Sequence, residues 1–140
     1  MLFRSEFTGL GEAVATWMAG GASITTLPLI AQASGAVVNF AIPSAGGEWA
    51  VIGPTFVEAA RGLAVDMSPD QFDAFVSRMA MAVAYGETST NLVQPFWLLI
   101  ILPVMGAGVR VQARDFMGYL IIPFLVAYGI TALLVTLAPV

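Results

Sequence analysis

The most constraining feature of this sequence is the length of its uncharged stretches. No charged residue occurs from 13 to 47, from 88 to 109 or from 116 to 140. A transmembrane helix needs about 20 mostly apolar residues, so each stretch is long enough to cross a bilayer. Only 10% of the residues are charged and 59% are hydrophobic, whereas a soluble domain carries about 25% charged residues. The sequence therefore predicts an all-α integral membrane protein.

Composition also excludes several functional classes. The chain contains no His, Cys or Lys, so it offers no pairing of a nucleophile with a base, and we predict no enzymatic activity. We also expect no cofactor and no bound metal, apart from a coupling proton or sodium ion. The net charge of -4 and the scattered arginines argue against nucleic acid as a partner.

The interruptions between apolar stretches divide the chain into segments of a single membrane domain. An amphipathic start predicts an interfacial helix. The alternatives are the frayed end of a span and a signal peptide, against which the acidic residues Glu6 and Glu12 argue. Ser68 as N-cap and Pro69 at the first helical position mark the start of a later helix. The predicted interfacial helix, re-entrant hairpin, broken transmembrane helix and last transmembrane helix cover, in order, residues 5–20, 26–63, 69–107 and 115–138.

The first polar interruption is residues 39–49, NFAIPSAGGEW, inside the predicted hairpin. Pro43 removes a backbone donor and the two glycines weaken the helix, so a new half-helix is expected to begin near residues 44–47. Its free N–H groups and positive dipole end would form an anion site. Glu48 is interpreted as a carboxylate in the first turn of this half-helix. The predicted substrate-binding residues here are Asn39, Ser44, Gly46 and Gly47.

The second interruption is residues 85–95, YGETSTNLVQP. Pro95 leaves the carbonyl of Asn91 without its helical donor, and broken helices hold substrate and ion in secondary transporters. Glu87, expected at the N-terminus of the second half-helix, is the ion-coupling candidate, with a role in complementing the helix dipole as the alternative. Either interruption alone is also compatible with a plain kink. The predicted substrate-binding residues here are Thr88, Thr90, Asn91, Gln94 and Trp97.

Three motifs in this chain resemble those of the short-chain fatty acid transporter family. They are N-F-x-I-P-S-x-G-G-x-W-A-V-x-G-P at 39–54, G-x-x-x-T-N-L-x-Q-P-F-W at 86–97 and R-D-F-M-G-Y at 114–119. Ala45, Glu87 and Ser89 depart from the residues that the family tends to have at those positions.

The resemblance implies symport of short-chain carboxylates such as acetoacetate or butyrate, driven by an ion gradient across a bacterial inner membrane. It implies that this chain is the C-terminal part of a transporter with two inverted repeats, and that the missing N-terminal half is a partner. The lipid bilayer, the carboxylate substrate and further copies in a homo-oligomer are the other expected partners. The substrate carboxylate would sit between residues 44–47 and 88–91, with its alkyl tail on Trp97.

Two other functions stay open. One is a related carrier of dicarboxylates or other anions. The lack of Arg or Lys near the interruptions argues against a dianionic substrate. The other is a membrane assembly subunit that does not transport, in which the polar residues only join helices.

Overall fold

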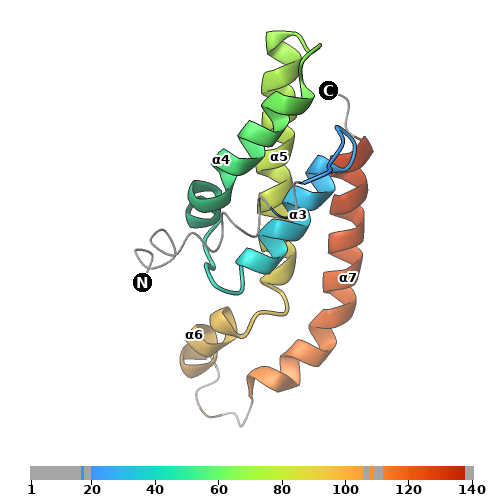
Figure 1. The fold of residues 1–140 in the computed structure, drawn as a ribbon. Coiled ribbons are helices and arrows are strands. Elements are labelled where there is room, and N and C mark those ends of the chain that lie inside the picture. The colour runs from blue at the N-terminus through green and yellow to red at the C-terminus, as the bar shows by residue number, and fades with distance from the viewer. Residues whose placement is uncertain (1–16, 18–19, 106–107, 109–111, 138–140) are drawn as a thin grey trace.

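The computed structural model describes residues 17, 20–105, 108 and 112–137 (Figure 1). No strand occurs in these ranges, so the predicted all-helical fold class is confirmed. The predicted interfacial helix over residues 5–20 lies outside the described residues, apart from Trp17 and Gly20. The helices are α3 (Leu27–Val38), α4 (Ala45–Leu63), α5 (Pro69–Thr90), α6 (Pro95–Met105) and α7 (Ala113–Leu137).

The helices α3 and α4 form a hairpin, and α5 packs against both of them. In Figure 1, α3 and α4 run in opposite directions, and residues 39–44 form the turn between them. The long helix α7 contacts α5 and α3, while the short helix α6 follows the end of α5. The re-entrant path of this hairpin in a bilayer and its pairing with an inverted repeat stay predictions.

Among the described residues, α7 is the helix that is long and apolar enough to cross a membrane. Its large apolar side chains point mostly outward, as Tyr119 and Ile122 do with exposed fractions of 82% and 71%. The helices α3 and α6 are apolar but shorter, and at about 1.5 Å per residue neither crosses a bilayer by itself. An exposed apolar surface of this size is expected where a helix faces lipid or another part of a membrane protein.

The helix α5 begins where the sequence predicts. The Ser68 hydroxyl accepts a hydrogen bond from the Gln71 N–H, and the Gln71 side chain accepts one from the Ser68 N–H. This capping box satisfies backbone donors that a helix start leaves free, and Pro69 occupies the first helical position. The helix then continues beyond Ala84 to Thr90.

The interruption after α5 lies closer to Pro95 than the sequence suggested. The linker is residues 91–94, because Pro95 opens α6 and the residues before a proline disfavour helical geometry. The prediction that Glu87 starts the second half-helix is therefore wrong. Glu87 lies in the last turn of α5, at the negative end of the helix dipole, so its carboxylate does not complement that dipole.

Two glycines allow the backbones of α3 and α5 to touch. A Cβ atom added at Gly35 would meet the Val83 carbonyl oxygen, and one at Gly86 would meet the Gln32 carbonyl oxygen, both closer than real Cβ atoms approach. Small residues at such a crossing let helices in membranes pack closely.

The Gln32 side chain connects α3 to α7. It donates to the Tyr128 backbone carbonyl at 3.1 Å and to the Thr131 hydroxyl at 2.9 Å.

Replacing either crossing glycine is expected to disrupt this packing. The variants Gly35→Ala and Gly86→Ala force the backbones of α3 and α5 apart, at an expected cost of about 1–3 kcal/mol. The matched control is Gly62→Ala on α4, where an added Cβ meets nothing within 4 Å. Thermal unfolding in detergent should show a lower midpoint for the first two variants and no fall for the control. Equal midpoints for all three variants would contradict the close crossing.

Candidate functional site

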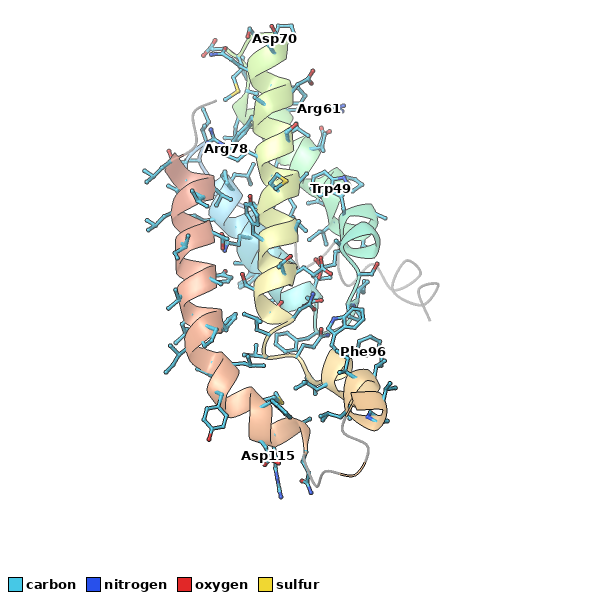
Figure 2. All side chains as sticks on the ribbon, turned by 180° about the vertical axis from the view of Figure 1, so that it is seen from behind. Trp49, Arg61, Asp70, Arg78, Phe96 and Asp115 are labelled. Carbon is cyan, nitrogen blue, oxygen red and sulfur yellow. The ribbon has the colours of Figure 1, made fainter. Side chains whose placement is uncertain are left out.

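The turn after α3 meets the linker after α5 in a cluster of polar side chains. We call Asn39, Glu87, Thr90, Asn91 and Gln94 the polar junction. All are buried except Asn91, which is partly buried. Figure 2 shows the chain passing from the end of α5 through the short linker into α6, where Phe96 is labelled. The glycine crossing explains this meeting, because Asn39 and Thr90 each lie four residues, about one helical turn, beyond Gly35 and Gly86.

The Asn39 side chain is the centre of the polar junction. Its Nδ2 donates to the Thr90 hydroxyl at 2.8 Å, to Asn91 Oδ1 at 2.9 Å and to the Glu87 carbonyl at 3.2 Å. An amide nitrogen has two hydrogens, so one of them is shared between acceptors. These contacts connect the α3–α4 turn to the last turn of α5 and to its linker.

The linker residues extend the same network. Gln94 Nε2 donates to the backbone carbonyl of Asn39 at 2.7 Å, and Trp97 Nε1 donates to Asn91 Oδ1 at 3.2 Å. Trp97 is 40% exposed and packs edge-on against Phe96. The structure thus brings together Asn39, Thr90, Asn91, Gln94 and Trp97, which are five of the predicted substrate-binding residues.

Among the described residues, the other predicted residues, Ser44, Gly46, Gly47 and Thr88, do not belong to this hydrogen-bond network. Ser44 caps α4, and its hydroxyl accepts from the Gly47 N–H at 3.4 Å. Ser44 and Gly46 are exposed, and a Cβ added at Gly46 would meet nothing within 4 Å. Thr88 is also exposed. The start of α4 is therefore an open helix N-terminus, as the sequence suggests, with one of its N–H groups already bonded to the cap.

Several buried side-chain oxygens near the junction have no donor in the described part of the chain. They are Asn39 Oδ1, Gln94 Oε1 and both carboxylate oxygens of Glu48. The amide orientations follow from the contacts above, because each amide nitrogen already faces oxygen acceptors. Buried polar atoms are normally hydrogen-bonded, so a group of unpaired oxygens indicates a place for a proton, cation or donor molecule.

Glu48 is more deeply buried than its sequence context suggests. It is interpreted there as a carboxylate of the first helical turn, and it does lie there, yet its exposed fraction is 0%. The Glu58 side chain on the same helix is 77% exposed and pairs with Arg61 at 3.4 Å. The sequence shows Glu48 as an acid directly after two glycines at a predicted half-helix start. Its burial cannot be read from these neighbours, because it depends on which face of α4 turns toward α5.

The fold and the junction define a helical protein whose interrupted helices meet at a buried polar centre, a feature of membrane transporters. The family model of the short chain fatty acid transporter matches residues 1–138. The chain belongs to the short-chain fatty acid transporter family, which is a family of transporters and not of enzymes. The predicted resemblance is confirmed, and family membership makes this an integral membrane protein.

Two curated relatives carry the name "Putative short-chain fatty acid transporter". The protein of Escherichia coli strain K12 is 39% identical over 116 residues, which cover 83% of this chain and 23% of that protein. The protein of Haemophilus influenzae is 38% identical over 114 residues, covering 81% of this chain and 23% of that protein. This chain thus spans about a quarter of the length of these relatives. No solved structure matches it.

Removing the central amide is expected to destabilise the junction. The variant Asn39→Leu removes the side-chain donor to the Thr90 hydroxyl and one of the two donors to the Asn91 side-chain oxygen, at an expected cost of about 1–3 kcal/mol. The control Thr88→Ala changes an exposed side chain on the same stretch of α5. The midpoint of thermal unfolding should fall for the first variant and stay within error for the second. An unchanged midpoint for Asn39→Leu would mean that the network contributes nothing to stability.

Proposed function

We propose that this chain forms part of the substrate site of a secondary transporter. The transporter takes up short-chain monocarboxylates such as acetoacetate or butyrate across a bacterial inner membrane, driven by an ion gradient. The chain supplies one half of the site, and the rest of the transporter supplies the other. Membership of the transporter family supports the class of function, and the relatives' names support the substrate class.

The observation that carries the proposal is the meeting of two helix interruptions in one polar centre. The α3–α4 turn contributes Asn39 and the α5–α6 linker contributes Asn91 and Gln94, directly bonded to one another. The helix α4 packs against α5, and Glu48 in its first turn is buried. Irregular backbone of this kind is stable at membrane depth only where it faces protein or a water-filled cavity.

The available groups suit a single carboxylate. The open start of α4 offers backbone N–H groups and the Ser44 hydroxyl, while Asn91 and Trp97 stand at the partly exposed edge of the junction. The exposed ring of Trp97 offers an apolar wall for a short alkyl tail. Neutral donors and a helix dipole bind an anion without a buried ion pair, which favours release as well as binding.

The first expectation concerns Ser44 and Asn91. Changing both to Ala in the complete transporter that carries this chain should weaken uptake of labelled butyrate. Loss of hydrogen bonds to a charged group costs about 1.5–3 kcal/mol each, equivalent to roughly ten- to hundredfold in affinity. Ser77→Ala, an exposed position on α5, is the matched control. Unchanged affinity and rate in the double variant would show that the substrate binds elsewhere.

The second expectation concerns substrate charge. Because no Arg or Lys occurs from residue 79 to 109, a second carboxylate would find no cation there, and burying it would be costly. Excess unlabelled butyrate should therefore inhibit labelled butyrate uptake far more strongly than excess succinate. Stronger inhibition by succinate would favour the alternative of a dicarboxylate carrier.

One observation favours the other candidate function, a membrane assembly subunit. The donor groups of Asn39 are used entirely within the chain, as expected of a residue that only joins helices. Butyrate uptake by the wild-type transporter decides between the two functions, because a subunit that only joins helices would give none.

A further inference from the structure

Glu48 is an acid in an unusual position for an ordinary structural residue. Its side chain is completely buried in the first turn of α4, and neither carboxylate oxygen has a hydrogen-bond donor among the described residues. Burying an ionised carboxylate without a partner is very unfavourable. A second component that carries positive charge would remove that cost.

In the part of the chain that the structure describes, the charged groups around Glu48 do not supply such a component. Glu87 on α5 is the charged side chain that interacts with it, and Glu87 is also acidic. The other packed helix, α3, contains no charged residue. Arg61 lies near the far end of α4, where it pairs with Glu58 in an exposed position, and Arg78 lies about two and a half turns before Glu87 on α5.

Further buried oxygen acceptors belong to the polar junction, of which Glu87 is a member. Among the described residues, Asn39 Oδ1 and Gln94 Oε1 have no hydrogen-bond donor, like the Glu48 oxygens. Asn39 Nδ2 also donates to the backbone carbonyl of Glu87 at 3.2 Å. Glu87 therefore connects the two acids to the polar junction. Carboxylate and amide oxygens are suitable ligands for a hard cation, and a carboxylate is equally able to take up a proton.

We propose that Glu48, with Glu87 beside it, binds the coupling cation of the transporter, either a proton or a sodium ion. The inference rests on the proposed function of ion-coupled transport. It moves the main coupling role from Glu87, which the sequence suggested, to Glu48. A proton or sodium ion bound there cancels one of the negative charges of the buried acids. The bound cation and the substrate carboxylate then cross the membrane together.

The test uses the complete transporter that carries this chain, reconstituted in proteoliposomes. Labelled butyrate is followed in two modes: accumulation driven by an ion gradient, and exchange against internal butyrate with no gradient. The variant Glu48→Gln should lose accumulation and keep exchange, because exchange requires no net movement of the cation. The matched control is Glu58→Gln, an exposed acid on the same helix, which should keep both activities.

A second measurement does not require transport. Binding of a cation to the folded state alone raises the midpoint of thermal unfolding. For purified wild type, the midpoint should rise with added sodium if the ion is sodium, or with falling pH if it is a proton. The choline salt is the control for ionic strength. Glu48→Gln should abolish that response, and Glu58→Gln should retain it.

The outcomes separate this inference from the proposed function. If the wild type takes up no butyrate, the proposed function fails, and the thermal response of Glu48→Gln still tests the cation site. If Glu48→Gln accumulates butyrate like the wild type, or keeps the full thermal response, the inference is overturned. If Glu48→Gln is folded by its unfolding midpoint, keeps exchange and loses accumulation, the inference is supported. If it does not fold, the uncharged variant Glu48→Met replaces it, and an unchanged cation dependence in that variant overturns the inference.

Discussion

The arrangement of this chain depends on the direct contact between the backbones of α3 and α5. Gly35 and Gly86 face one another's helices so closely that a single added methyl group on either would collide with main-chain atoms. One turn further along, the same contact places Asn39 beside Thr90 and fixes where the α3–α4 turn meets the α5–α6 linker. The polar junction is therefore a consequence of helix packing as much as of the polar residues themselves.

Much of the fold could be predicted from local sequence properties. The uncharged stretches indicate membrane helices, and Ser68 with Pro69 marks the start of α5 because capping depends on neighbouring residues. The position of the second interruption was predicted less accurately. Pro95 fixes the start of α6, whereas Ser89 and Thr90 remain helical because their hydroxyl groups donate to carbonyls one turn earlier.

The candidate site was predictable only in part, because its geometry depends on contacts between distant segments. Asn39, Asn91 and Gln94 were identified from polar residues in apolar surroundings, and the structure bonds them together. The complete burial of Glu48 could not be read from its neighbours, since it follows from the face that α4 turns toward α5. The contact of the two crossing glycines could not be read from the sequence either, because each glycine and its contact partner lie about fifty residues apart in the chain.

The hydrogen bond from Gln94 to the Asn39 carbonyl has a mechanical consequence. It joins the turn between α3 and α4 to the linker between α5 and α6, so neither segment can shift without displacing the other. A tilt of α4 would be passed through this bond to α6, while α3 and α5, in backbone contact, would move as one rigid pair. The starts of α4 and α6 are thus both connected to the packed α3–α5 pair at one place.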